Sequence, residues 1–200
     1  MSGYRLEFKG VAKHFPPMRR TDGEGVLAID GVDVAIADGE VVALIGPSGC
    51  GKSTLLNLAS GLDRPSRGKV FVDGEEVDGP NEHVAFMLQK DLLLPWRTIR
   101  KNVEFGQEIR GLDSAERRDR ADRFLAKYHL SDFADRYPHE LSGGMRQRAA
   151  LARTMVMYPD VLLLDEPFSA LDAQTKMVLQ QDLARTLYEE KKTALLITHD

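Results

Sequence analysis

The chain has 200 residues, which at about 150 residues per domain is one large domain or one domain with a substantial insert. Hydrophobic residues make up 42% and charged residues 29%, proportions close to globular averages that exclude a mainly disordered or fibrous chain. The net charge of −4, from 27 Lys and Arg against 31 Asp and Glu, lacks the broad basic excess that binds nucleic-acid backbones, so we expect no nucleic-acid partner.

The N-terminal part of the chain predicts a small antiparallel β region. Residues 4–9 alternate apolar and charged side chains, the period of a half-buried strand. Residues 16–25 are polar and rich in turn formers, which favours a loop. Within residues 68–77, Asp73 and Gly74 separate two apolar stretches, and this pair suits a two-residue hairpin turn.

Three short, continuous apolar runs have a different character. They are Val41–Ile45, Val161–Leu164 and Ala194–Ile197. Runs of this kind predict parallel strands that are buried on both faces. No run reaches the roughly 18 apolar residues of a membrane span, so we expect any link to a membrane to go through another protein.

Residues 90–158 predict a mainly helical insert in this α/β core. Asp113 and Glu116 have the spacing of a capping box at the start of a helix. One side of that helix carries the apolar residues Ala121, Phe124, Leu125 and Tyr128. Ser142 and Asp172 are also suitable N-caps, and we expect a helix after each.

A glycine-rich segment joins the first apolar run to a predicted helix, in the context that a phosphate-binding loop requires. Its residues are Gly46, Pro47, Ser48, Gly49, Cys50, Gly51, Lys52, Ser53 and Thr54. Backbone N–H groups of such a loop converge on phosphates, Lys52 neutralises them and the Ser53 hydroxyl can ligate Mg²⁺. The sequence therefore predicts a site for a nucleoside triphosphate. Because Cys50 is the single cysteine, an intrachain disulfide and a cysteine-based zinc site are excluded, which suits a reducing cytoplasm.

Two carboxylates, Asp165 and Glu166, follow the second apolar run. Open α/β sheets place their ligands at the carboxyl ends of such strands. We therefore expect Asp165 to hold Mg²⁺ and Glu166 to orient and deprotonate the attacking water.

Residues 141–148, Leu-Ser-Gly-Gly-Met-Arg-Gln-Arg, resemble the signature motif of ATP-binding cassette (ABC) proteins. Gln89 resembles the family's Q-loop, residues 169–172 its D-loop with Asp172, and His199 its switch histidine, in the family's order. The resemblance implies an ABC nucleotide-binding domain over residues 1–200. Its α/β core, of P-loop NTPase (RecA-like) type with a mainly parallel sheet, would span 1–89 and 159–200, and a helical subdomain 90–158.

The resemblance also implies the roles of individual residues. The catalytic residues would be Glu166, Gln89 and His199, with Ser53, Gln89 and Asp165 at Mg²⁺. The signature residues Ser142, Gly143, Gly144 and Met145 would contact ATP held by a second subunit, in a head-to-tail homodimer. Met145 stands where the family usually has Gln, so a side-chain hydrogen bond to nucleotide is lost there. Phe15 lies where relatives stack an aromatic ring on adenine, and a plain core phenylalanine is the alternative.

Residues 93–99, the pair 102–103 and residues 137–140 resemble the ATPase subunits of nitrate, sulfonate and taurine importers. This implies a peripheral protein at the cytoplasmic face of the inner membrane. Its partners would be membrane permease subunits and, indirectly, an extracytoplasmic solute-binding protein. Trp96, the single tryptophan, is a candidate for contact with the permease, against the alternative that it is buried in the insert.

Two other functions remain open. A soluble P-loop kinase would leave the signature and Gln89 unexplained. A nucleotide-binding fragment or regulatory module without efficient turnover is the better alternative, because the chain ends at Asp200 and family members continue past the switch histidine. On that basis we expect the C-terminal part of the core to be missing.

Overall fold

The computed structural model describes residues 3–17, 25–169 and 171–198. Two compact units are present. The α/β unit comprises residues 1–86, 160–165 and 187–200, and the helical unit comprises residues 87–159 and 166–186. Most of the predicted loop at 16–25 lies outside the described residues.

The α/β unit contains an antiparallel sheet with the strand order β2-β1-β4-β5. Its strands are β1 (Tyr4–Phe15), β2 (Val26–Ala37), β4 (Arg67–Val72) and β5 (Glu75–Glu76). Val72 pairs with Glu75 across the turn of Asp73 and Gly74, whose φ angles are 53° and 79°. These two positive φ angles are those of a tight primed turn, which confirms the predicted hairpin.

The second sheet has the order β3-β8-β7-β6, and β8 runs parallel to both β3 and β7. Its strands are β3 (Val41–Leu44), β6 (Val84–Met87), β7 (Val161–Asp165) and β8 (Thr193–Ile197). β7 and β8 are buried almost throughout, as their apolar runs predict. The same prediction is wrong for the first run, because Val41 is 46% exposed and Ile45 71% exposed. Among the described strands, β3 lies at the edge of its sheet and pairs only with β8.

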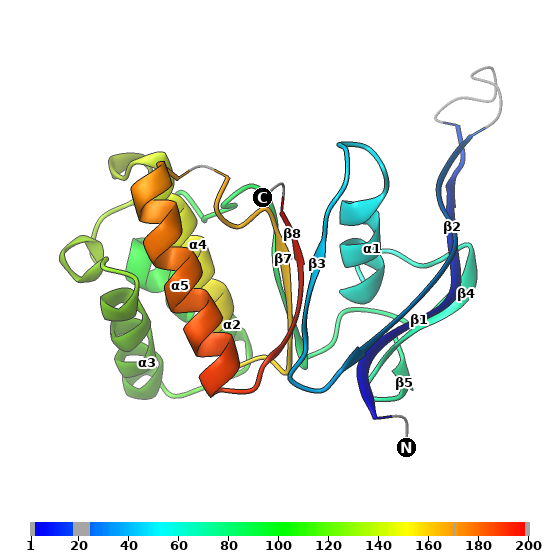
Figure 1. Ribbon diagram of the computed structural model, residues 1–200. Helices are drawn as coiled ribbons and strands as arrows, with labels where there is room; N and C mark the ends of the chain where they lie inside the picture. Colours follow the sequence, from blue (N-terminus) through cyan, green and yellow to red (C-terminus); the bar gives the residue numbers. More distant parts are fainter. Residues whose placement is uncertain (1–2, 18–24, 170, 199–200) are drawn as a thin grey trace. The chain divides into compact units, whose positions relative to one another are not determined.

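Helix α1 (Lys52–Ala59) lies between the two sheets of the α/β unit (Figure 1). It contacts β7 and β8 of the parallel sheet and β2 and β4 of the antiparallel sheet. Leu56, Leu58 and Ala59 are buried in the core formed with these strands. A fully buried leucine stabilises the fold by roughly 1.5–3 kcal/mol. This packing fixes the helix that follows the phosphate loop.

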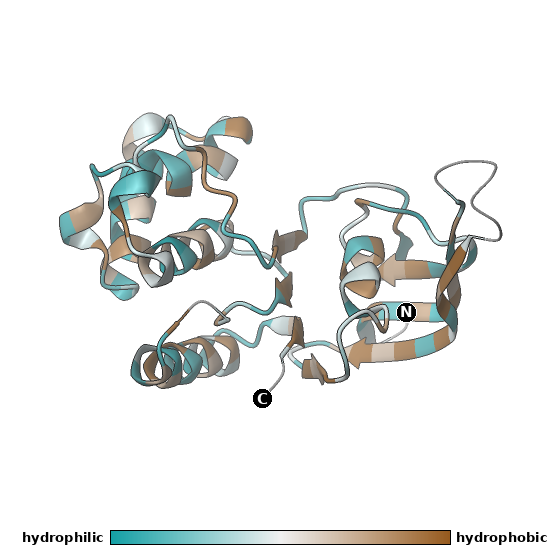
Figure 2. Ribbon diagram, turned by 90° about the horizontal axis from the view of Figure 1, so that it is seen from above, coloured by the Kyte–Doolittle hydropathy of each residue, from teal (hydrophilic) through white to brown (hydrophobic). Residues whose placement is uncertain are grey.

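The helical unit is built from helices that are longer than α1. They are α2 (Ile99–Ile109), α3 (Ser114–Lys127), α4 (Gly143–Met155) and α5 (Ala173–Glu189), with short 3-10 turns at Ser131–Phe133 and Pro138–Glu140. Asp113 and Ser142 cap α3 and α4 through their side chains, as predicted. Figure 2 shows apolar and polar segments mixed along these helices. In the described part of the chain, no helix has the length and apolar character needed to cross a bilayer.

Candidate functional site

The predicted phosphate loop lies between β3 and α1 of the α/β unit. Gly51 is the N-cap of α1 and has a φ angle of 95°. A Cβ at this position would lie 2.5 Å from the carbonyl oxygen of Ala28. Both the backbone conformation and the neighbouring strand therefore require glycine at Gly51.

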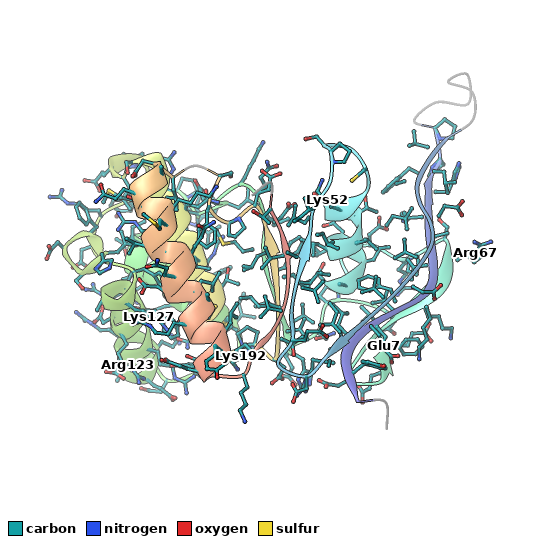
Figure 3. All side chains as sticks on the ribbon, viewed as in Figure 1. Glu7, Lys52, Arg67, Arg123, Lys127 and Lys192 are labelled. Atoms are coloured by element: carbon teal, nitrogen blue, oxygen red, sulfur yellow. The ribbon has the colours of Figure 1, made fainter. Side chains whose placement is uncertain are left out.

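Lys52 is held inside this loop, at the start of α1 (Figure 3). Its Nζ donates to the carbonyl oxygens of Gly46 and Pro47, each at 2.8 Å, and lies 3.6 Å from the Sγ of Cys50. Ser53 follows it and is exposed. The first turn of α1 has no acidic side chain, so the positive potential of the helix N-terminus is not neutralised locally. The arrangement suits an anion.

The strand register places Asp165 at the same edge of the sheet as the phosphate loop. Leu44 at the end of β3 and Asp165 at the end of β7 both pair with Ile197 of β8. The carboxyl ends of the three parallel strands therefore meet there. Asp165 is 7% exposed. His199 was predicted to contact the γ-phosphate and lies outside the described residues.

Glu166 and Gln89 come together in the helical unit, although they are 77 residues apart in the sequence. The Nε2 of Gln89 donates to the Oε2 of Glu166 at 3.1 Å. Glu166 has a φ angle of 48°, which is uncommon for a residue with a side chain. A residue with a side chain is strained in this left-handed region, and such strained residues cluster at functional sites.

The signature residues form the N-terminus of α4. The Ser142 Oγ accepts a hydrogen bond from Met145 N at 3.3 Å, so the amide of the atypical fifth residue is used by the cap. Helix geometry gives the N–H groups of Gly143 and Gly144 no acceptor within α4. α4 therefore presents a second helix N-terminus suited to an anion.

The predicted D-loop residue Asp172 and the predicted adenine-stacking residue Phe15 lie outside the motifs described so far. Asp172 precedes α5, and its Oδ1 accepts from Thr175 N at 3.0 Å, a bond that holds the pKa of the Asp172 carboxyl below its ordinary value. Ala170 of the predicted D-loop lies outside the described residues. Phe15 ends β1 and is 39% exposed, with the Lys13 Nζ 5.0 Å from its ring centroid. It is therefore not a core phenylalanine.

Trp96 is 72% exposed, which excludes its burial inside the insert. The segment around it is held by a residue whose structural role sequence reasoning missed. Asn102 on α2 is fully buried; its Nδ2 donates to the carbonyl oxygens of Leu94, Arg97 and Thr98, and its Oδ1 accepts from Leu94 N at 2.7 Å. The sequence marked Asn102 only as a member of the importer-like pair 102–103, which gave no indication of this structural role.

Comparisons with known proteins show which family and which solved structures the chain resembles. The family model described as ABC transporter matches residues 29–169. A nitrate import ATP-binding protein of Synechocystis is 45% identical over 175 residues, 88% of this chain and 66% of the relative. An aliphatic sulfonates import ATP-binding protein of Mesorhizobium japonicum is 46% identical over 194 residues, 96% of this chain and 69% of the relative. A solved dimeric ATP-binding cassette, in a post-hydrolysis state bound to ADP and Pi, superposes with a TM-score of 0.89 and 34% identity, covering 98% of this chain and 88% of that one.

Proposed function

Because the chain belongs to the ABC transporter family, whose ATP-binding proteins are ATPases, we propose that it is the ATP-hydrolysing subunit of an importer that energises solute uptake through a membrane permease. One observation carries this proposal: a single chain presents two helix N-termini suited to an anion, at α1 behind the phosphate loop and at α4 behind Ser142. Hydrolysis by a lone P-loop domain would use only the first.

ATP binding is assigned to the phosphate loop and to Phe15. Lys52 supplies a positive charge for the β- and γ-phosphates, and the backbone amides of the loop supply neutral donors. The exposed ring of Phe15 offers a face on which adenine can stack. The binding residues we propose are Phe15 and Gly46, Pro47, Ser48, Gly49, Cys50, Gly51, Lys52, Ser53 and Thr54.

The donor set fits Mg²⁺, which would enter with ATP. Ser53 offers a hydroxyl, Asp165 a carboxylate and Gln89 an amide oxygen, the hard oxygen ligands that Mg²⁺ prefers. When bound, the ion neutralises negative charge on the phosphates. Asp165 supplies its charge from the end of the buried strand β7.

Glu166 is the proposed general base, which accepts a proton from the water that attacks the γ-phosphate. The hydrogen bond from the Gln89 amide to Glu166 Oε2 holds one carboxylate oxygen, which restricts the side chain's orientation. We assign to His199 a contact with the γ-phosphate in the same reaction. Asp172, in the D-loop, would act where two subunits meet.

We propose that the active form is a head-to-tail homodimer. The α4 N-terminus, with Ser142, Gly143, Gly144 and Met145, would bind the γ-phosphate of ATP held by the partner subunit. The solved cassette that resembles this chain is dimeric, which supports the assignment. Exposed Trp96 is our candidate for contact with a permease at the cytoplasmic face of the membrane.

The solute we propose is a small oxyanion or sulfonate of the nitrate, alkanesulfonate or taurine kind, delivered by an extracytoplasmic solute-binding protein. Residues 93–99 and the names of the two importer relatives support this class. The solute itself is selected by the partners and not by residues of this chain.

The test is Glu166→Gln, which keeps the side chain's shape and removes the base. We expect ATP hydrolysis to fall by roughly 10²- to 10⁴-fold while ATP binding persists, because the phosphate loop is untouched. Steady-state phosphate release and equilibrium ATP binding measure the two effects. The control Glu189→Gln, at the exposed end of α5, should leave both unchanged. Near-normal turnover in Glu166→Gln would remove Glu166 from its assigned role.

A further inference from the structure

Two arginines of α4 hold the segment that follows Gln89. The Nε of Arg146 donates to the Oδ2 of Asp91 at 3.0 Å, and the two side chains are 35% and 28% exposed. The same guanidinium donates to the carbonyl oxygen of Leu141 at 2.8 Å. Leu141 directly precedes the signature serine, so Arg146 joins the start of the signature to the segment after Gln89.

Arg153 makes the second attachment, seven residues or about two turns further along the same face of α4. It donates to the backbone oxygen of Asp91 at 2.6 Å and to that of Leu92 at 2.8 Å. Burial lowers the pKa of the Arg153 guanidinium, although it stays charged. A partly buried guanidinium loses its hydration and depends on protein hydrogen-bond acceptors. The hydrogen bonds from Arg153 therefore hold the carbonyl groups of Asp91 and Leu92 in place.

Gln89 lies between this attachment and the catalytic carboxylate. Asp91 is two residues away, and its Oδ1 accepts from Leu93 N at 3.2 Å, which turns the chain locally. In the other direction, the Gln89 amide donates to Glu166. A continuous path of hydrogen bonds and two covalent steps therefore runs, inside the helical unit, from Leu141 through Arg146 and Asp91 to Gln89 and Glu166.

We propose that Arg146 and Arg153 are positioning residues that transmit the state of the signature to Gln89 and Glu166 of the same subunit. The inference rests on the proposed function, because it takes Gln89 and Glu166 as hydrolytic groups. In the head-to-tail dimer, the signature of one subunit serves the partner's ATP, while its Gln89 and Glu166 serve its own. The path therefore couples the two ATP sites, so that ATP at one site aligns the hydrolytic groups of the other.

The attachment is tested first without nucleotide, by hydrogen–deuterium exchange over residues 89–97 of the whole chain. Arg146→Gln, Asp91→Asn and Arg153→Gln should each speed exchange in this segment, because its fixed points are lost. Arg153→Lys keeps the charge but lacks the planar guanidinium, whose two terminal nitrogens each donate to one of the two carbonyl groups, so its effect should be smaller than that of Arg153→Gln. Arg136→Gln, which breaks a surface pair with Glu140 in the same unit, is the control. Unchanged exchange in Arg146→Gln and Arg153→Gln would overturn the proposal.

The coupling is tested by ATPase rates over a range of ATP concentrations. In Arg146→Gln and Asp91→Asn we expect kcat to fall roughly tenfold and the Hill coefficient to approach one, with ATP affinity unchanged. The double variant should be no slower than either single variant, because both remove one interaction. Exchanging the two charges, as Asp91→Arg with Arg146→Asp, should restore part of the rate. Wild-type kcat and Hill coefficient in both single variants, or additive losses in the double variant, would overturn the coupling.

The two arms separate this inference from the proposed function. A wild-type protein that binds ATP and never hydrolyses it would contradict the proposed function, and the exchange measurement would still decide whether the arginines hold the segment. A wild-type protein that hydrolyses ATP with rates insensitive to Arg146 and Asp91 would leave the proposed function intact and remove the positioning role.

Discussion

At the residue scale, the two glycines in the middle of the phosphate loop have different reasons to be glycine. Gly49 and Gly51 have φ angles of 81° and 95°, both in the left-handed region. A Cβ on Gly49 would meet no atom within 4 Å, whereas one on Gly51 would lie 2.5 Å from Ala28 O. The first position restricts only the backbone conformation, and the second also restricts the space beside β2.

Gly51→Ala should therefore be more harmful than Gly49→Ala. Each alanine costs about 1–2 kcal/mol for a left-handed backbone. Gly51→Ala adds a backbone clash, for which about 1–3 kcal/mol is typical of overpacked sites. We expect a lower Tm and weaker ATP binding in Gly51→Ala than in Gly49→Ala, by thermal unfolding and nucleotide titration. Equal effects of the two substitutions would show that the contact with Ala28 is unimportant.

Sequence reasoning could assign the phosphate loop, Asp165 and the signature because each is a run of neighbouring residues with its own flanking elements. Glu166 could be assigned for the same reason, although its positive φ could not. Asp91 and Arg153 could not be found, because their contacts join positions about 60 residues apart without any periodic pattern. Roles that depend on such contacts require the fold.

At the element scale, apolar runs predicted three parallel strands but not their burial. β3 and β7 have equally apolar sequences, yet β7 is buried throughout and β3 is not. The burial of a strand depends on which strands and helices flank it in the sheet. The residues of the strand itself do not specify these neighbours. Helix caps such as Asp113 and Ser142 were predictable because capping involves residues only two or three positions apart.

The attachment of residues 94–98 to α2 gives a prediction at this scale. Asn102→Asp keeps the acceptor for Leu94 N and replaces the NH₂ group, which faces three carbonyl oxygens, with an oxygen. We expect a loss of about 3 kcal/mol or more near neutral pH. Burial and the facing carbonyls raise the pKa of the introduced carboxyl, and its protonation restores a donor. The loss should therefore shrink as pH falls through that raised pKa.

Denaturant unfolding at several pH values measures this effect. Arg123→Gln provides a control on α3, where Arg123 makes an exposed pair with Asp119 (Figure 3). Its loss should stay within about 0.5 kcal/mol at every pH. A deficit in Asn102→Asp that does not depend on pH would mean that the carboxyl stays in one protonation state, and would contradict the raised pKa.

At the scale of the whole molecule, the motifs are divided between the two units, and the resemblance to ABC proteins is what predicts an assembly. The phosphate loop belongs to the α/β unit, whereas Gln89, Glu166 and the signature belong to the helical unit. The sequence predicted a helical insert at 90–158, and the helical unit of the structure also includes residues 166–186. The sequence could not predict that residues 166–186 belong to the helical unit. The N-cap Asp172 indicates that a helix follows, and it does not indicate which unit that helix packs in.

Head-to-tail assembly predicts that two inactive variants restore each other. Ser142→Arg places a bulky cation at the α4 N-terminus and should block the partner's ATP, and Glu166→Gln removes the base. Mixed before ATP is added, they form dimers in which the intact Glu166 of one subunit faces the intact signature of the other. If half of the dimers are mixed and each has one competent site, about a quarter of the wild-type rate is the upper limit. The coupling proposed above lowers that figure by up to about tenfold, because the intact Glu166 belongs to the subunit whose own signature is blocked. Ser142→Ala, which loses the same cap without added bulk, controls for a weakened helix. Phosphate release no higher in the mixture than in either variant alone would mean that the signature does not act on the partner's site.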